Sequence, residues 1–194
     1  PEGQAYINPD EKLQAEYEQK RVAYLEEKAA LAQFVGKETK TADGVKVELC
    51  ANIGKPEDAL KVVECDGEGI GLFRTEFLFM DRPQIPTEEE QFAAYKKVAE
   101  TLEGKPVIIR TLDVGGDKEI PYLALEKEEN PFLGFRAIRL CLKREDLYRP
   151  QLKALLRASA YGDIRIMVPM VTCLDELRAV KNMIAELKEE LKAE

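Results

Sequence analysis

Two Arg-Thr pairs in this sequence each follow a short apolar run. The first run begins at residue 69 and stops at Arg74, and the second begins at residue 107 and stops at Arg110. A short, continuously apolar run is typical of a parallel strand that is covered on both faces. We therefore expect both arginines at the carboxyl ends of strands, which is where parallel α/β sheets carry their binding sites.

Arginine at such a position indicates anion binding. Its planar guanidinium donates two parallel, charge-assisted hydrogen bonds to a phosphate or carboxylate and stays charged near neutral pH. Arg136, which follows a long irregular passage, is a third candidate. The alternative for each arginine is an ion pair with a neighbour such as Glu76 or Asp113. The repeated placement at strand ends favours anion binding for Arg74 and Arg110, whereas both interpretations stay open for Arg136.

Other candidate groups are weaker. The segment Gly115-Gly116-Asp117-Lys118 offers backbone N–H groups and a lysine for an anion, but a tight turn explains its glycines equally well. Cys50 and Cys173 lie near expected strand ends without any local feature that would activate a thiol. The sequence contains no histidine, which removes the commonest general base, the commonest metal ligand and any phosphohistidine from this chain.

Composition places the chain among globular proteins with one core and an appendage. It has 194 residues, 45% of them hydrophobic and 34% charged, and a formal net charge of -8. That acidity argues against nucleic-acid or anionic-membrane surfaces. No apolar run approaches the roughly 20 residues of a membrane span, and the N-terminus does not resemble a signal peptide. Four scattered cysteines without C-x-x-C spacing predict a reduced, cytoplasmic protein with mostly buried thiols.

Hydrophobic periodicity and capping signals predict one long helix followed by four strand-helix units. The helix is expected to start with Asn8 as cap and Pro9 in its first turn, and to end near Gly36. Thr87 and Glu90 form the signature of a capping box. The expected strands are residues 45–53, 69–73, 107–112 and 164–170, and the expected later helices are residues 56–63, 87–102, 148–161 and 172–194, with a further helix after Arg136.

This order predicts a parallel sheet with helices outside it. Four such units are half of a (β/α)8 TIM-type barrel, so we expect a half barrel preceded by a long helix. A small open, doubly wound sheet is the alternative. The absence of Gly-x-Gly-x-x-Gly after the first strand argues against a dinucleotide site in either arrangement.

Three motifs carry a family resemblance. They are Gly-Ile-Gly-Leu-Phe-Arg-Thr-Glu-Phe-Leu-Phe-Met at residues 69–80, Ile-Arg-Thr-Leu-Asp-Val-Gly-Gly-Asp-Lys at 109–118, and Glu-Asn-Pro-Phe-Leu-Gly-Phe-Arg-Ala-Ile-Arg at 129–139. The chain resembles the enzyme I family of the bacterial phosphoenolpyruvate-dependent sugar phosphotransferase system along its whole length. Pyruvate phosphate dikinase and phosphoenolpyruvate synthase share the Arg-Thr-Glu strand but match the other two motifs less well.

The resemblance implies a phosphoenolpyruvate-binding (β/α)8 domain, with residues 1–36 as linker helix and residues 37–194 as the first half of the barrel. It implies that Arg74 and Arg110 bind phosphoenolpyruvate and that Arg136 lies close to the phosphoryl group. In that family the phosphoryl group passes to a histidine on another domain and then to a histidine-containing phosphocarrier protein, which drives sugar uptake. The resemblance further implies that the parent enzyme is a cytoplasmic homodimer that uses Mg²⁺ held by a glutamate and an aspartate.

The resemblance also places several functional groups outside this sequence. The phosphoaccepting histidine would precede Pro1. The carboxylates that bind Mg²⁺, a further arginine and the cysteine that acts as general acid would follow Glu194, so no catalytic residue or metal ligand is expected here. We therefore expect a fragment that self-associates or folds poorly and does not transfer phosphoryl groups alone. A non-catalytic binding or scaffold half barrel, and another phosphoenolpyruvate or sugar-phosphate barrel, are the alternative interpretations.

Overall fold

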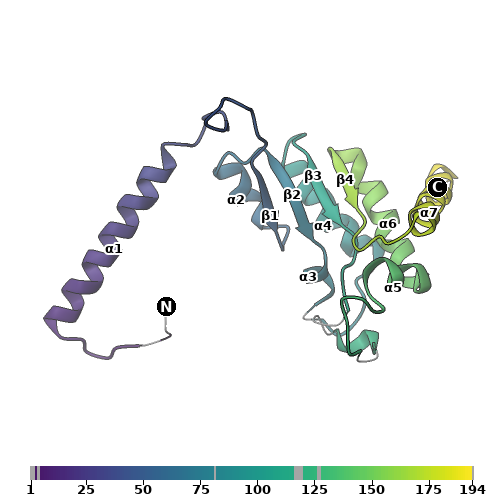
Figure 1. The fold of residues 1–194 in the computed structure, drawn as a ribbon, viewed down its shortest axis with the longest axis horizontal. Helices are drawn as coiled ribbons and strands as arrows, with labels where there is room; N and C mark the ends of the chain where they lie inside the picture. The colour runs from purple at the N-terminus through teal and green to yellow at the C-terminus, as the bar shows by residue number, and fades with distance from the viewer. Residues whose placement is uncertain (1–2, 4, 81, 116–119, 126–127, 194) are drawn as a thin grey trace.

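The computed structural model describes residues 3, 5–80, 82–115, 120–125 and 128–193. Within these ranges the chain forms an α/β fold with a four-stranded, all-parallel sheet and seven α-helices (Figure 1). The strands are parallel, as predicted, and their spatial order, β1-β2-β3-β4, is also their order in the sequence. The strands are β1 (Cys50–Ile53), β2 (Gly69–Arg74), β3 (Val107–Arg110) and β4 (Ile164–Met167).

Three of the expected strands are shorter in the structure, and one of them, β3, ends at Arg110 instead of residue 112. Residues 45–49 do not join β1, because Lys46 pairs with Lys40 in an isolated antiparallel bridge instead of extending the parallel ladder. Strand β4 ends at Met167, and the chain then turns at Pro169 and Met170. Proline lacks the N–H that a ladder requires, and Met170 has a left-handed φ of 60°, so neither residue continues a strand.

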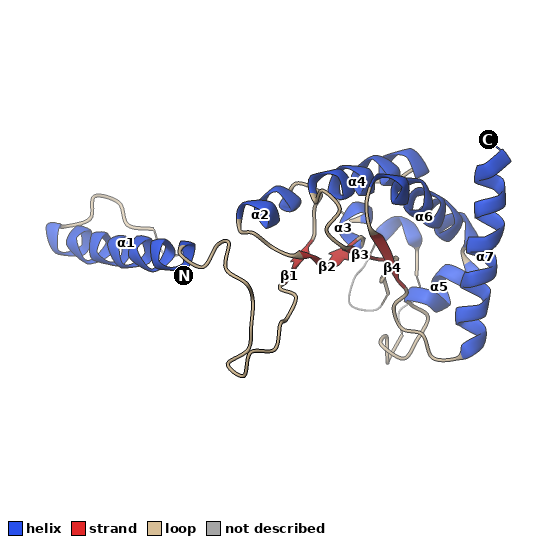
Figure 2. Ribbon diagram, turned by 90° about the horizontal axis from the view of Figure 1, so that it is seen from above, coloured by secondary structure: helices blue, strands red, loops and turns tan. Residues whose placement is uncertain are grey.

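Helices cover one side of the sheet, as the view from above shows (Figure 2). Helices α4 and α6 pack against each other there, and Val107 and Ile109 of β3 are buried while Ile108 and Arg110 of the same strand are only half-buried. Residues alternate between the two faces of a strand, so Arg110 points away from the side that the helices cover. The helices after β1 are α2 (Asp58–Glu64), α3 (Glu76–Phe79), α4 (Glu88–Thr101), α5 (Ala137–Lys143), α6 (Glu145–Ala158) and α7 (Leu174–Ala193).

The main core lies between the sheet and these helices. The ring of Phe73 on β2 meets Tyr95 of α4 edge-on, with centroids 6.0 Å apart, and both side chains are fully buried. The capping box predicted at the start of α4 is confirmed: Thr87 and Glu90 exchange both hydrogen bonds. Helix α7 buries Val180 and Leu187.

Helix α1 (Glu11–Ala32) stands apart from the sheet and buries none of its residues (Figure 1). The expectation that Asn8 caps it is wrong. Asp10 is the cap, and its Oδ1 accepts a hydrogen bond of 2.8 Å from the backbone N–H of Leu13. Asn8 has φ of 50°, whereas a cap residue needs the extended conformation that Asp10 adopts. The helix also ends earlier than predicted, at Ala32, and a turn leads from there to Gly36.

No helix within the described residues is both long and apolar enough to cross a membrane.

Candidate anion-binding site

Arg74 and Arg110 are direct neighbours across the sheet. Each is the last residue of its strand, β2 and β3, and the two are partners in the parallel register. Register partners on adjacent strands point to the same face, so both guanidinium groups leave the carboxyl edge of the sheet on one side. The prediction that two arginines meet at this edge is confirmed.

Two acidic side chains hold the guanidinium of Arg110. Nη2 pairs with Oε1 of Glu76, and Nη1 lies 3.2 Å from Oδ2 of Asp113. The Glu76 side chain is 1% exposed and that of Arg110 is 17% exposed, so this pairing takes place almost out of water. The ion-pair alternative is therefore also realised. These contacts fix the orientation of the guanidinium, because few of its torsions remain free once both nitrogens are bound.

Arg136 joins the same cluster through Asp113. Its Nη2 lies 2.8 Å from Oδ1 of Asp113, and its side chain is 4% exposed. Thus Arg136, for which both interpretations stayed open, has an ion pair and also lies one carboxylate away from Arg110. Its guanidinium stacks on the ring of Phe132, with Cζ 4.9 Å from the ring centroid.

A close backbone approach places Arg136 beside the end of β3. The N–H of Ala137 donates to the carbonyl of Val114 at 3.2 Å, and a Cβ added to Gly115 would lie 2.4 Å from Cβ of Arg136. Gly115 also has φ of +142°, which side-chain-bearing residues rarely adopt. Glycine is therefore required at this position both for its conformation and for the contact with Arg136.

Arg74 is held differently from the other two arginines. Among the described residues it forms no ion pair; its guanidinium stacks on the ring of Phe77, with Cζ 4.8 Å from the centroid. Gly54, just after β1, leaves room for this stack, because a Cβ there would lie 3.0 Å from the Phe77 ring. Asp58 lies near enough to interact with Arg74. Its pKa is lowered mainly by hydrogen bonds from the backbone N–H groups of Lys55 and Gly54, and to a smaller extent by the charge of Arg74.

The site retains unused hydrogen-bond donors. The Nε atoms of Arg74 and Arg110 are both buried and have no hydrogen-bond acceptor among the described residues. A buried donor without an acceptor costs about 1 to 3 kcal/mol, and more when it is charged. Glu76 and Asp113 pair with Arg110 and Arg136, whereas Arg74 has no ion pair among the described residues. This arrangement is suited to binding a phosphate or carboxylate group.

Sequence reasoning missed the role of the threonine that follows Arg74. Thr75 is fully buried, and its hydroxyl donates a 2.7 Å hydrogen bond to the carbonyl of Arg110, which ties the ends of β2 and β3 together. The repetition of Arg-Thr at both strand ends was the available signal. The proposed nest at Gly115-Gly116-Asp117-Lys118 lies, apart from Gly115, outside the described residues.

The cysteines lie outside this cluster of contacts, and all four are free thiols. The expectation of mostly buried thiols is wrong: Cys65 and Cys173 are exposed and Cys50 is half-buried, because they lie at helix and strand ends that the core does not cover. Cys141 is buried, and its burial, together with the charge of Asp113, raises the pKa of its thiol to about 12. It is therefore a neutral packing residue.

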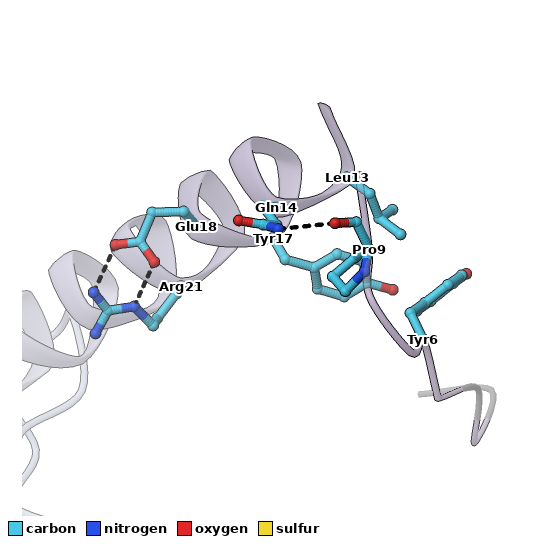
Figure 3. Close-up of a pocket in the computed structure, with 7 residues that line it drawn as sticks. All are labelled: Tyr6, Pro9, Leu13, Gln14, Tyr17, Glu18 and Arg21. Carbon is cyan, nitrogen blue, oxygen red and sulfur yellow. Dashed lines mark hydrogen bonds and ion pairs between the residues drawn. The ribbon is translucent and has the colours of Figure 1, made fainter. Parts of the chain in front are cut away.

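Neither a metal site nor the cavity on α1 competes with the arginine cluster. No group of three or more His, Cys, Asp or Glu side chains within the described ranges is arranged to hold a metal ion, and Glu76 and Asp113 already bind arginine. A cavity of about 540 Å³ lies between the start of α1 and the residues before it, lined by Tyr6, Pro9, Leu13, Gln14, Tyr17, Glu18 and Arg21 (Figure 3). It stands on the helix that is separate from the sheet.

A parallel sheet with paired arginines at its carboxyl edge is an arrangement typical of α/β domains that bind anions. The chain belongs to the PEP-utilising enzyme family: residues 28–194 match the PEP-binding domain of that family. This match bears out the resemblance that the three sequence motifs indicated.

Relatives with curated names are similar along nearly the whole chain. The phosphoenolpyruvate-protein phosphotransferase of Geobacillus stearothermophilus is 58% identical over 190 residues, which are 98% of this chain and 33% of the relative. That of Priestia megaterium is 55% identical over 193 residues, 100% of this chain and 34% of the relative. That of Bacillus subtilis (strain 168) is 54% identical over 189 residues, 97% and 33% respectively. The chain thus spans about a third of the length of these relatives.

Proposed function

We propose that this chain is the phosphoenolpyruvate-binding part of a phosphoenolpyruvate-protein phosphotransferase, and that Arg74, Arg110 and Arg136 bind the substrate. The observation that carries the proposal is the register pairing of Arg74 with Arg110 at the carboxyl edge of the sheet, with a buried Nε donor on each. The family of the chain and the names of its relatives support phosphoenolpyruvate as the ligand.

Phosphoenolpyruvate carries a carboxylate and a phosphate on a small rigid frame, so it needs at least two guanidinium groups held at a fixed spacing. Adjacent strands lie about 4.8 Å apart, which sets such a spacing for Arg74 and Arg110. Glu76 and Asp113 orient Arg110 before the ligand arrives, which reduces the entropy lost on binding. Arg136, which is less exposed, adds a third positive charge beside Asp113.

The rest of the proposal concerns the parent enzyme. The resemblance to enzyme I implies that the phosphoryl group passes to a histidine and then to a histidine-containing phosphocarrier protein. Since the chain has no histidine, the accepting histidine would lie elsewhere in the parent enzyme. Mg²⁺, which stabilises charge on a transferring phosphoryl group, would be held by carboxylates other than those described here, and no step of this proposal depends on it. Homodimerisation and a cytoplasmic location belong to the same proposal.

We also propose the domain division that the sequence suggested, with residues 1–36 as a linker helix and residues 37–194 as half of a (β/α)8 barrel. The separation of α1 from the sheet supports the division. Four parallel strands in sequential order, with helices on one side only, support the half barrel, because the uncovered face corresponds to a barrel interior.

Calorimetric titration of the chain with phosphoenolpyruvate, with and without Mg²⁺, tests the proposal. We expect saturable binding that weakens at least tenfold in Arg74→Ala, a loss of about 1.4 kcal/mol. Arg74 is the suitable site for alanine, because it has no ion pair among the described residues and its removal leaves no carboxylate unpaired there. Arg110→Lys should weaken binding similarly, since lysine keeps the charge but loses the planar fork.

Arg178→Ala is the matched control. Arg178 is an exposed arginine on α7 that pairs with Asp175 of the same helix, so its loss removes one positive charge that takes no part in the ion pairs of the arginine cluster. The affinity of the Arg178→Ala variant for phosphoenolpyruvate should stay within about twofold of that of the parent chain. Equal affinity in Arg74→Ala and the parent would refute the assignment of the site, and pyruvate or inorganic phosphate binding as tightly would refute the choice of ligand.

A further inference from the structure

A buried glutamine on α6 connects the two segments that carry the carboxylates of the site. Gln151 is fully buried, and its Oε1 accepts a 2.9 Å hydrogen bond from the backbone N–H of Leu112, just beyond β3. Its Nε2 donates to the hydroxyl of Thr75, just beyond β2, at 3.2 Å, and to the hydroxyl of Tyr95 on α4, also at 3.2 Å. One side chain thus bridges two strand ends and two helices.

The hydrogen-bond partners determine the orientation of the Gln151 amide. The Thr75 hydroxyl donates its only proton to the carbonyl of Arg110, so it must accept from Gln151. The Tyr95 hydroxyl donates to Oε1 of Gln91, whose Nε2 in turn donates to the carbonyl of Pro86. Tyr95 must therefore accept as well, and both Nε2 protons of Gln151 are used.

The side chains of this network are buried from water, and the Tyr95 hydroxyl keeps its proton. Thr75, Gln91, Tyr95 and Gln151 are all fully buried. Burial raises the pKa of the Tyr95 hydroxyl well above its ordinary value, so this hydroxyl remains a donor over the whole physiological range. A buried amide with every donor and acceptor satisfied is rigid, because moving it would leave several polar groups unpaired at once.

The residues that this network binds are adjacent in sequence to the ones that hold Arg110. Thr75 precedes Glu76 and Leu112 precedes Asp113, and these two carboxylates bind the two Nη atoms of Arg110. The Thr75 hydroxyl also binds the backbone carbonyl of Arg110 itself. A displacement of either segment would therefore move a carboxylate relative to the guanidinium.

We propose that Gln151 is a positioning residue of the anion site: through Thr75 and Leu112 it fixes the spacing between Glu76 and Asp113, and thereby the orientation of the Arg110 guanidinium. Its effect on ligand affinity rests on the proposed function, whereas its effect on Arg110 does not. Packing alone does not require an amide here, since an apolar side chain of equal length would fill the same volume without the need for three hydrogen-bond partners.

The test compares Gln151→Met with Leu156→Ala in the full 194-residue chain. Methionine keeps the length and flexibility of glutamine but removes the bridge. Leu156 lies on the same helix, packs against the core and takes no part in the network, so its truncation controls for a general loss of stability. Both variants are measured at a temperature where chemical denaturation shows each to be at least nine-tenths folded.

The first readout needs no ligand. In the parent chain the Nη protons of Arg110, assigned with Arg110→Lys, should give separate NMR signals, because ion pairs with Glu76 and Asp113 slow guanidinium rotation. We expect these signals to merge in Gln151→Met and to stay separate in Leu156→Ala. Retention of separate signals in Gln151→Met, or their loss in both variants, overturns the inference.

The second readout is phosphoenolpyruvate affinity, expected to fall at least fivefold in Gln151→Met and less than twofold in Leu156→Ala. If the parent chain binds no phosphoenolpyruvate, the proposed function fails, and the Arg110 signals still decide the inference. If Gln151→Met does not fold, Thr75→Val removes the hydroxyl that Gln151 binds, and Thr75→Ser restores it. The inference then requires merged Arg110 signals in Thr75→Val and separate signals in Thr75→Ser; any other result refutes it.

Discussion

Arg110 and Arg136 bind the two oxygens of a single carboxylate. Oδ2 of Asp113 lies 3.2 Å from Arg110 and Oδ1 lies 2.8 Å from Arg136, and all three side chains are largely buried. Like charges on two arginines this close would repel each other without the carboxylate between them. Asp113 therefore makes it possible for β3 and the segment before α5 to bring two guanidinium groups to one place.

Asp113→Ala should lower the free energy of unfolding by roughly 3 kcal/mol, because it leaves two buried guanidinium groups without their shared partner. Urea denaturation at pH 7 measures this change. Asp163→Ala is the control, since Asp163 pairs with Arg165 at an exposed position, and its loss should cost less than about 1 kcal/mol. Equal costs for the two substitutions would contradict the importance of the shared carboxylate.

Gly115→Ala should be more costly than Gly104→Ala. Both glycines have positive φ, of +142° and +87°, but only at Gly115 would the new Cβ collide, at 2.4 Å, with Cβ of Arg136. The conformational penalty is about 1 to 2 kcal/mol at each position, and overpacking adds about 1 to 3 kcal/mol at Gly115. Thermal or urea unfolding of the two variants measures the two costs. A Gly104→Ala cost that equals or exceeds the Gly115→Ala cost would refute the close approach.

Phe77→Leu should weaken phosphoenolpyruvate binding, while Phe132→Leu should not. Among the described residues Arg74 forms no ion pair and is oriented by its stack on Phe77, a contact of about 0.5 to 1 kcal/mol. Arg136 stacks similarly on Phe132 but is also held by Asp113. We expect about a threefold loss of affinity by calorimetry in Phe77→Leu and less than a twofold change in Phe132→Leu. The reverse order would show that the stack does not orient Arg74.

Glu90→Ala should destabilise the chain in a pH-dependent way. Hydrogen bonds from the Thr87 N–H, the Arg82 guanidinium and the Thr87 hydroxyl lower the pKa of Glu90 to about 2. A carboxyl whose pKa is lower in the folded state stabilises the fold above its ordinary value near 4.5, and this contribution disappears as the pH falls from there toward 2. Nearly half of this side chain is exposed, so we expect only about 1 kcal/mol at pH 7.

Urea denaturation of the parent and Glu90→Ala chains between pH 7 and pH 3 measures this contribution, and the difference should shrink on acidification. Glu100→Ala is the control on the same helix. Glu100 pairs only loosely with Lys96, at 3.7 Å, and should contribute less than about 0.5 kcal/mol at pH 7. A difference between parent and Glu90→Ala that grows toward pH 3 would contradict the capping role.

The chain should self-associate at its β4 edge. In the described sheet β4 has one hydrogen-bonded neighbour, and Leu174, which begins the next helix, is 67% exposed. Open strand edges and exposed apolar side chains favour association. In sedimentation velocity, the sedimentation coefficient should increase with protein concentration. Leu174→Lys should reduce this increase, whereas Leu133→Lys, at another exposed leucine, should leave it unchanged. A monomer at every concentration would refute this prediction.

The sequence by itself determined the alternation of strands and helices, the placement of Arg74 and Arg110 at strand ends and the capping box at Thr87. These features depend on residues a few positions apart, so periodicity and capping preferences are enough to predict them. Local signals failed where two neighbouring positions competed: Asn8 and Asp10 are both good caps, but only Asp10 has the extended backbone that a cap requires.

The tertiary structure decided which groups hold the arginines. Asp113 meets Arg136 across 23 positions of sequence, Leu112 meets Gln151 across 39, and Thr75 meets Gln151 across 76. Such pairings depend on how helices α4 and α6 pack on the sheet and on the space that Gly115 leaves for Arg136. No local preference encodes them, because in the unfolded chain each of these polar groups forms hydrogen bonds with water. Only when the fold buries them does each group need a partner within the protein.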